Sequence, residues 1–507
     1  MTLPAPSTTR TTDLAMEAQP HLRREMSLLG LVATAVAAMV GVGVNILPFM
    51  VQRSQPGIGA WVPLAYVVAA VPAVLAAICY AALVSAMPRA GGSYVNVSRA
   101  LSPFAGFIAS FSQWFGLSMA MGVVAYFLVP VIRDLVSVMG FPGIAGSLDH
   151  TLPRLAVSLL SLWLAWLLNL LGIRLYERSV VVMAAVTIVA PIIMTIAGAL
   201  NSPESFLEKL NSTGTPVPVP MPMPPLTTAA FLGTAVVLFS SFIGFDAVAQ
   251  AAGEARHPGD LARAIMIAIA GVTAYYVLFT WSVYHAIPAA YIYASSMVHD
   301  ISAPGLMSPL LPQWLSALIL ASVAIAILKV LPALMLANSR TLYAFSTDGI
   351  LPKQFSYLSP RFRTPPYALT ITAIAASLCV FGCNLAGTFF LGVDLLVVSM
   401  LVNFLLMAGA LLMFPRVNPE LYAQITFLKS RTLQVSVAGG ALLLLGSLLL
   451  VEVIEDVFSA TKWYLKSTTS WIVVMIMACI LFWRFWVRVS GQGLDPETQI
   501  FGRLPSE

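Results

Sequence analysis

The chain alternates between long apolar runs and short polar connections. A helix needs about 20 apolar residues to cross a bilayer, since each residue rises about 1.5 Å against a hydrocarbon thickness of about 30 Å. Twelve segments meet this requirement, and the pattern therefore predicts an all-α polytopic membrane protein with twelve transmembrane helices. They are residues 28–51, 59–86, 104–130, 152–172, 179–200, 227–251, 262–288, 314–343, 366–385, 388–414, 432–451 and 469–489.

The composition excludes other classes of protein. The 507 residues include 26 Lys or Arg and 21 Asp or Glu, while 59% are apolar and the mean hydropathy is +0.89. A soluble protein carries about 25% charged residues, a disordered chain has low hydrophobicity, and a nucleic-acid-binding protein presents a dense basic face. The polar residues 1–27 contain no apolar core of a signal peptide, and we expect a mobile tail.

Lys and Arg are distributed unequally between the two sides of the predicted membrane. Nineteen lie on the side of the N-terminal tail, and the opposite side has six: Arg53, Arg133, Arg154, Lys209, Lys462 and Lys466. Because cytoplasmic loops are enriched in basic residues, we predict that both termini are cytoplasmic, in a cell inner membrane or plasma membrane. The proline-rich external connection 201–226 favours an extended spacer, and we expect no catalytic centre there or in the other long external loop, 289–313.

The sequence offers little that points to an enzyme. The four cysteines, Cys79, Cys379, Cys383 and Cys479, lie in apolar runs and are interpreted as core residues. We find no metal-ligand cluster, no Ser and His pair and no pair of facing acids in the predicted spans. We therefore expect no catalytic residue, no metal and no cofactor.

Two predicted spans contain glycine in their middle. The first carries Gly41 and Gly43 ahead of Pro48, and the sixth carries Gly244 just before Asp246. Glycine allows a helix to unwind, and an unwound backbone survives in a membrane only beside a cavity or inside protein. Paired interruptions in the two halves of a chain are typical of a transporter's substrate site. Close helix packing is the alternative explanation.

Six short motifs, in order, give the sequence its resemblance to the amino acid, polyamine and organocation (APC) transporter family. The likeness covers nearly the whole hydrophobic region. The motifs are Gly41-Val42-Gly43 before Pro48, Pro88-Arg89-Ala90-Gly91-Gly92-Ser93-Tyr94, Asn169-Leu170-Leu171-Gly172-Ile173-Arg174, Phe242-Ile243-Gly244-Phe245-Asp246 through Glu254-Ala255-Arg256-His257-Pro258, Ser339-Arg340 with Asp348-Gly349-Ile350-Leu351-Pro352, and Thr364-Pro365-Pro366.

The resemblance implies a leucine-transporter-like fold. Residues 28–414 would form two inverted repeats of five helices, residues 415–489 two additional helices, and residues 490–507 a cytoplasmic tail. Substrate would lie between the broken first and sixth spans, with its carboxylate at the backbone N–H of Gly43 and its ammonium at the carbonyls of Met39, Ser240 and Ile243. The substrate-binding set is then Met39, Gly41, Val42, Gly43, Ser240, Ile243, Gly244, Asp246 and Leu334.

The sequence departs from the family pattern at several of these positions. Val42 stands where Ser or Ala is common, which weakens the case for an ordinary α-amino acid carboxylate. Ser240 and Leu334 stand where a large aromatic residue is frequent, which suggests a roomier site. Lys329 lies where the eighth span often has Ser or Thr.

Lys329 lies deep in the eighth predicted span. An isolated Lys at a helix centre costs about 2.5 to 3.5 kcal/mol, so we expect it to face a partner, a cavity or backbone carbonyls. In sodium-dependent relatives the first and eighth spans hold the ion, and the ammonium of Lys329 is placed to replace it. Two roles stay open for Lys329: a fixed cation, or an ion-coupling group that releases its proton during transport.

Asp246 has two interpretations. Its carboxylate is suited to bind a cationic substrate group, pair with a basic residue or take up a proton, and equally to cap the half-helix that follows the break. At the cytoplasmic ends of spans six and eight, Glu254, Arg256 and Arg340 are candidates for an inner gate, although surface ion pairs are common and weak.

We therefore predict a secondary active transporter that moves an amino acid by alternating access, without sodium, and with proton coupling or exchange. A polyamine or cationic amino acid transporter is the alternative within the same class, and a non-transporting sensor or partner subunit is the alternative outside it. The partners expected are a small-molecule substrate and the lipid bilayer, not nucleic acid, with the protein a monomer or homodimer.

Overall fold

The computed structural model describes residues 26–89, 91–171, 189–212, 222–250, 252, 255–362 and 364–492. These residues are almost entirely helical, and their only β-type pairing is an isolated bridge between Met26 and Ala255. Ten helical segments among them are long and apolar enough to cross a membrane. They are η1 and α4 (Gly59–Ala86), α6 (Pro103–Val138), α8 (Thr151–Leu170), α12 through α13 (Thr228–Gln250), α14 (Gly259–Ala286), α17 (Gln313–Thr347), α18 (Pro366–Ala386), α19 (Phe390–Val417), α21 (Arg431–Phe458) and α22 (Ser467–Gly491).

The first predicted span is divided into three short helices. These are α1 (Leu28–Met39), α2 (Val42–Asn45) and α3 (Leu47–Ser54). The side chain of Ser27 caps α1 by accepting a hydrogen bond from the N–H of Gly30. Of the fifth predicted span the structure describes α10 (Val189–Leu200). The tail 1–25, the residues before α10 and the C-terminal residues 493–507 lie outside the described part.

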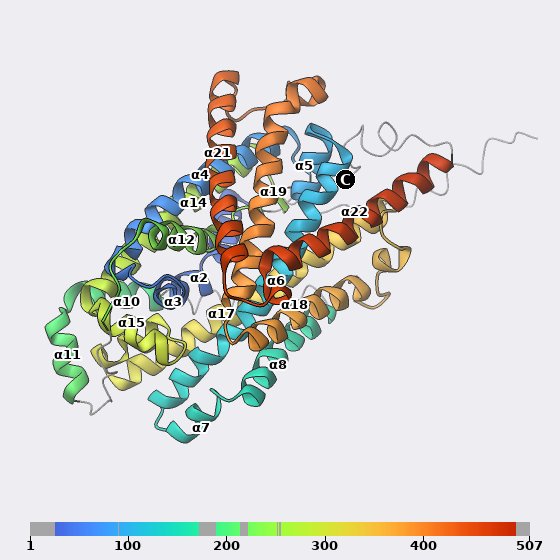
Figure 1. The fold of residues 1–507 in the computed structure, drawn as a ribbon. Helices are drawn as coiled ribbons and strands as arrows, with labels where there is room; N and C mark the ends of the chain where they lie inside the picture. Colours follow the sequence, from blue (N-terminus) through green and yellow to red (C-terminus); the bar gives the residue numbers. More distant parts are fainter. Residues whose placement is uncertain are drawn as a thin grey trace, which may run out of the picture.

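Short helices connect the spans at both ends of the molecule. They are α5 (Gly92–Ala100), α7 (Pro142–Ser147), α11 (Pro203–Ser212), α15 (Ala289–Val298), α16 (Ala303–Met307), η4 (Ser308–Leu310), η5 (Lys353–Ser356), α20 (Pro419–Tyr422) and η6 (Trp463–Leu465). Figure 1 shows α5 and the end of α22 at one end of the molecule and α7 and α11 at the opposite end. Arg99 lies in α5 at the first of these ends, and Arg133 lies in α6 close to α7 at the other.

Two expectations about connections need correction. The segment 201–226 is not a uniform spacer, because α11 forms there and buries Phe206 and Leu210.

The eleventh span does not end at residue 451, because α21 continues to Phe458. The apolar run stops at Glu452, yet this side chain is buried, so the helix continues through residues that the hydropathy pattern had excluded.

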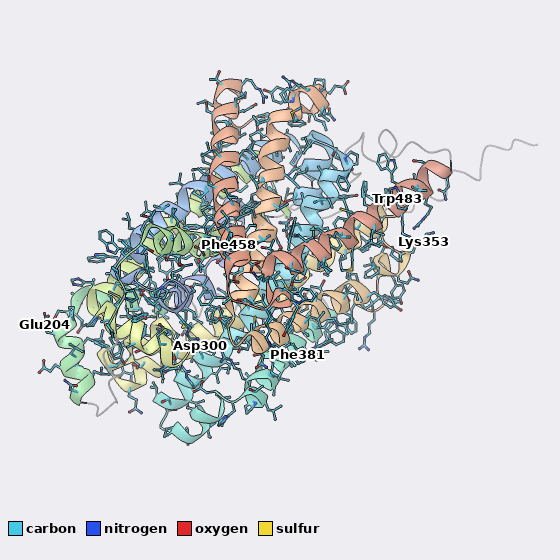
Figure 2. The ribbon with its side chains drawn as sticks, viewed as in Figure 1. Glu204, Asp300, Lys353, Phe381, Phe458 and Trp483 are labelled. Atoms are coloured by element: carbon cyan, nitrogen blue, oxygen red, sulfur yellow. The ribbon has the colours of Figure 1, made fainter. Side chains whose placement is uncertain are left out.

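The centre of the protein is α6, which packs against α17, α19, α18, α5 and α8. The most apolar stretch of α6 is almost wholly buried. In α8, α21 and α22, most residues of the most apolar stretch are only partly buried or are exposed. Large apolar side chains cover the outer helices, among them Phe381 and Trp483 (Figure 2). An apolar exterior of this kind is stable beside lipid, so the chain is a multi-pass membrane protein.

Candidate functional site: two interrupted spans

The first interruption lies between α1 and α3. Val40 takes an extended conformation after Met39, and Ile46 departs again from helical geometry before α3. The amide of Asn45 donates a hydrogen bond of 2.8 Å to the carbonyl of Gly41. The break therefore satisfies part of its own backbone with a polar side chain, as a buried unwound segment requires.

The second interruption lies between α12 and α13. After Ser240–Phe242, which form the 3₁₀ turn η2, Ile243 is extended and Gly244 has φ +134°. A side chain is strained in this backbone conformation, so glycine is required at position 244. The N–H of Gly244 donates to the carboxylate of Asp246 over 3.1 Å.

Asp246 is the polar centre of the second interruption. Besides the N–H of Gly244, it accepts hydrogen bonds from the side-chain amides of Gln113 and Gln250. Its side chain is 2% exposed. Gln113 belongs to α6, so this hydrogen bond joins a central span to the break, as side-chain amides commonly do between membrane helices.

The two interruptions contact each other directly. A Cβ atom on Gly43 would lie 2.8 Å from both Cβ and Oγ of Ser241. A Cβ atom on Gly244 would lie 2.9 Å from the carbonyl carbon of Ala38. Each glycine therefore lets the backbone of the other interrupted span approach more closely than a side chain permits, and both explanations offered for these glycines, unwinding and close packing, apply.

Two tyrosines hold the interruptions together. The hydroxyl of Tyr276, from α14, lies 2.7 Å from the carbonyl oxygen of Met39 and 2.9 Å from that of Ser241, and donates to them. The hydroxyl of Tyr66, from α4, lies 3.0 Å from the carbonyl of Gly43. Sequence reasoning missed Tyr66, Tyr276 and Ser241, because a tyrosine in an apolar span gives no local signal that distinguishes it from ordinary packing.

Lys329 lies near the middle of α17 and is 7% exposed. The side chain of the next residue, Val330, reaches within 3.2 Å of where a Cβ on Gly41 would lie. The residue next to Lys329 thus contacts the first interruption, and the role of Lys329 stays a prediction. Leu334, one turn further along α17, is half-buried and packs against the apolar core.

The other predicted binding residues lie along the same two breaks. Ser240 is buried, and its hydroxyl donates back to the carbonyl of Val237 over 2.6 Å. Ile243 is buried, and its N–H donates to the carbonyl of Ser240 over 3.2 Å. The backbone of Val42 begins α2.

The predicted inner gate is only partly described. Arg256 and Arg340 have exposed side chains, and Glu254 lies outside the described residues. The N–H of Arg256 donates to the carbonyl of Met26 over 2.9 Å, so the segment after the sixth span pairs with the residue just before α1. This backbone pairing joins the ends of the two interrupted spans that the sequence assigns to the cytoplasm, and an ionic gate stays a prediction.

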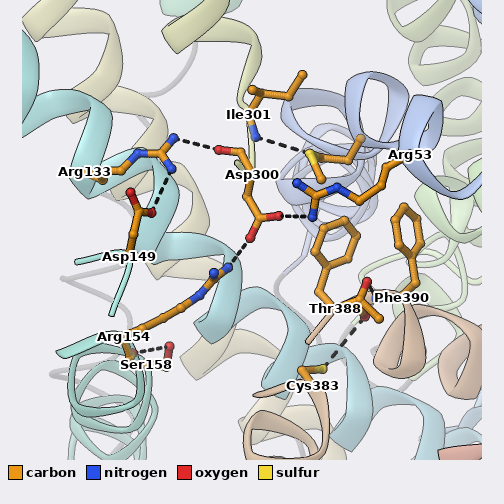
Figure 3. A network of polar contacts seen from close by, with 12 residues as sticks. Arg53, Arg133, Asp149, Arg154, Ser158, Asp300, Ile301, Cys383, Thr388 and Phe390 are labelled. Atoms are coloured by element: carbon orange, nitrogen blue, oxygen red, sulfur yellow. Dashed lines mark hydrogen bonds and ion pairs between the residues drawn. The ribbon is translucent and has the colours of Figure 1, made fainter. Parts of the chain in front are cut away.

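At the opposite end of the molecule, three arginines converge on one aspartate (Figure 3). The carboxylate of Asp300 accepts from Arg53, at the end of α3, and from Arg154, in α8. Its backbone carbonyl accepts from Arg133, in α6, over 2.7 Å. Arg133 also pairs with Asp149 over 3.0 Å. These residues line a cavity of about 570 Å³ at this end of the molecule.

One negative expectation is wrong. The spans do contain acids that face a common space, because Asp394 of α19 and Glu452 of α21 line the same cavity. Asp394 lies within the tenth predicted span, and an intramembrane acid is a signal that sequence reasoning should have used. Glu452 falls one residue beyond the predicted end of the eleventh span, so its position inside the bilayer region was missed.

Comparison with known sequences decides the family. A sequence model of the amino acid permease family matches residues 26–485. The chain belongs to this family. It is 23% identical to the branched-chain amino acid permease BcaP of Bacillus subtilis, over 72% of this chain and 77% of the relative. It is 24% identical to the low-affinity putrescine importer PlaP of Escherichia coli, over 72% of this chain and 73% of the relative.

A plant relative, the vacuolar cationic amino acid transporter 2 of Arabidopsis thaliana, is 27% identical over 71% of this chain. The match spans only 55% of that relative's length. Membership of the permease family identifies the chain as a non-enzymatic membrane transporter. Within the described residues, no group of three or more His, Cys, Asp or Glu side chains is arranged to hold a metal ion.

Proposed function

We propose that this permease carries an amino acid across the cytoplasmic membrane by alternating access. The observation that supports this most directly is the meeting of the two interrupted spans, where Gly43 abuts Ser241 and Gly244 abuts Ala38. A carrier needs backbone N–H and C=O groups that can exchange hydrogen bonds within the protein for hydrogen bonds to a ligand. Segments without continuous helical hydrogen bonding supply such groups near the membrane midplane.

The proposed architecture has twelve spans, with residues 28–414 as two five-helix inverted repeats and residues 415–489 as two further helices. Both termini would be cytoplasmic, in an inner or plasma membrane. The separation of α5 and the end of α22 from α7 and α11 supports alternate crossing (Figure 1). The excess of basic residues at the first of these ends supports the orientation.

The substrate would bind where the two interruptions now contact each other. Its carboxylate would accept a hydrogen bond from the N–H of Gly43. Its ammonium would donate hydrogen bonds to the carbonyls of Met39, Ser240 and Ile243. The carbonyl of Met39 already accepts from Tyr276. Because a carbonyl oxygen has two lone pairs, the ammonium would use the second one or displace the tyrosine. The relation to a branched-chain amino acid permease supports an amino acid as substrate.

A cationic substrate is the second candidate. Asp246 is buried at the break, and the groups that donate to it, from Gln113, Gly244 and Gln250, are all neutral. A carboxylate held by neutral groups keeps its full charge for an incoming cation. The relation to a putrescine importer and to cationic amino acid transporters supports this alternative.

Transport would not require sodium. Lys329 is next in the chain to Val330, whose side chain faces Gly41 of the first interruption, and its ammonium would supply the positive charge that a sodium ion supplies in sodium-dependent carriers. The driving force would then be a proton gradient or an exchanged solute. Moving one charge against 100 mV costs about 2.3 kcal/mol, which sets the scale of the energy that coupling must provide.

The test is uptake by the purified protein in liposomes. A panel of branched-chain, cationic and small neutral amino acids and putrescine would be offered with sodium and proton gradients imposed separately. We expect saturable uptake of one class with no response to sodium. Stimulation by a sodium gradient would contradict the assigned role of Lys329. Ligand binding without uptake or exchange under any gradient would contradict a carrier and favour a sensor.

A further inference from the structure

A second cavity, of about 450 Å³, lies beside the end of α3, the start of α19 and the end of α21, and Val237 of α12 forms part of its wall. Four carboxylates line it: Asp394, Glu452, Glu455 and Asp456. Its other walls include the hydroxyl side chains of Ser459 and Thr461 and the apolar side chains of Val237, Phe390, Leu391 and Leu465. Four acids in so small a space create a strongly negative site with apolar sides.

Two of the four carboxylates are satisfied by donors. Glu455 accepts from the side-chain amide of Gln55 over 2.9 Å. Asp456 accepts from the backbone N–H groups of Ser467 and Thr468 over 3.1 and 2.9 Å. Gly233 of α12 makes room for this arrangement, because a Cβ there would lie 2.5 Å from Glu455.

The carboxylates of Asp394 and Glu452 have no such donor. Glu452 is 5% exposed and Asp394 is half-buried. Among the residues that the structure describes, none donates a hydrogen bond to either carboxylate. A buried carboxylate without a partner is costly. Both line the cavity, so the group that completes them is one that enters it.

The neighbouring cations are engaged elsewhere. Arg53 lines this cavity as well as the cavity at Asp300, but its guanidinium donates to Asp300 (Figure 3) and to the carbonyl of Ser296. Lys466 donates to the carbonyl of Val457, and Lys462 lies over the ring of Tyr464. The negative charge of Asp394 and Glu452 is therefore not matched from these three side chains.

We propose that Asp394 and Glu452 form an external binding site for a small organic ammonium ion, separate from the interruptions of the first and sixth spans. A primary ammonium carries three N–H donors, which suits two carboxylates and a hydroxyl, and the apolar wall accommodates a short carbon chain. A metal ion fits less well, because no described group of three His, Cys, Asp or Glu side chains has a metal-holding arrangement. The cavity lies in the size range of small-molecule sites.

The test measures binding of n-butylammonium and of 1,4-diaminobutane to the purified full-length protein by calorimetry. We expect Glu452→Gln and, separately, Asp394→Asn to weaken binding by about 30-fold or more, as expected for the loss of one buried charge partner. Glu208→Gln, an exposed acid on α11, is the matched control and should bind as the wild type does. Two conservative variants keep the test decisive if one of them fails to fold.

Three outcomes would overturn the proposal. The first is unchanged amine binding in both cavity variants. The second is loss of all amine binding in Asp246→Asn, which would place the ammonium at the central interruptions. The third is binding of Ca²⁺ or Mg²⁺, but of no amine, at Glu452. The proposed carrier function is tested separately, by uptake of the central substrate, and does not depend on these results.

Discussion

The hydroxyl of Tyr94 donates a 2.5 Å hydrogen bond to the carboxylate of Asp348. Tyr94 lies in α5, which follows the second span, and Asp348 caps the end of α17. The guanidinium of Arg99 lies 5.9 Å from the ring centre of Tyr94. One hydrogen bond thus connects two halves of the protein at the end that we assign to the cytoplasm.

The Tyr94–Asp348 contact predicts a specific dependence of stability on pH. Burial raises the pKa of Asp348 above its usual value, against the opposing effects of the Tyr94 hydroxyl and Arg99. A raised folded-state pKa favours the folded protein at low pH, and this contribution is lost as pH rises from about 4 through the folded pKa. Asp348→Asn should therefore gain stability relative to the wild type as pH rises through this range.

The measurement is the Tm of both proteins between pH 4 and pH 8. Glu420→Gln, an exposed acid on α20 at the same end of the protein, is the control and should follow the wild type. A constant difference in Tm between Asp348→Asn and the wild type would show that Asp348 titrates alike in the folded and unfolded states.

The contacts between the two interruptions predict intolerance to any side chain at two glycines. Gly43→Ala should cost about 1 to 3 kcal/mol through overpacking against Ser241. Gly244→Ala should cost about 1 to 3 kcal/mol, because its φ is also unfavourable for alanine. Both should reduce uptake. Gly271→Ala, exposed on α14 with no atom within 4 Å of the new Cβ, should be neutral or stabilising. Equal effects at Gly43 and Gly271 would contradict the close approach.

Tyr276 predicts a link between stability and transport. Tyr276→Phe removes the donor to the carbonyls of Met39 and Ser241, and a buried group left unsatisfied costs about 1 to 3 kcal/mol. We expect a lower Tm and an altered KM for uptake, since one of these carbonyls belongs to the proposed ammonium site. Tyr367→Phe, at an exposed position on α18, should leave both unchanged. A normal KM in Tyr276→Phe would remove the Met39 carbonyl from the substrate site.

Substitution of Lys329 tests how transport is driven. Lys329→Met keeps the length of the side chain and removes its charge, so uptake should fall strongly if the ammonium is needed at the first interruption. Residual uptake with its full proton dependence would make Lys329 a fixed cation, whereas loss of proton dependence would make it the coupling group. Lys353→Met, exposed in η5, is the matched control. Wild-type uptake rates in Lys329→Met would contradict both roles.

We predict strong energetic coupling between the segments that meet at Asp300. Asp300→Asn removes the charge shared by Arg53 and Arg154, and the loss should destabilise the protein by roughly 2 to 5 kcal/mol, as for other buried charge pairs. A double-mutant cycle with Arg154→Gln should show clear non-additivity in the free energy of unfolding. Additive effects would mean that Asp300 and Arg154 do not stabilise each other.

The sequence was sufficient for the class of protein and for most of its helices. Hydrophobic length is a local property, so the runs that became α4, α6, α14 and α17 can be recognised without knowing what surrounds them. Gly244 before Asp246 marks an interruption for the same reason, since glycine and a short acid act on their own backbone. The boundary of α21 was misplaced, because hydropathy cannot tell that Glu452 is buried by neighbouring helices.

Only the tertiary structure decided which residues meet. Tyr276 reaches Met39 across 237 positions of the chain, and Arg53 reaches Asp300 across 247. Such partners depend on how helices rotate and cross, and no local pattern records these angles. The cavity of Asp394 and Glu452 has the same origin, since Asp394 lies in α19, the other three acids lie in α21, and the four come together only when these helices pack against each other.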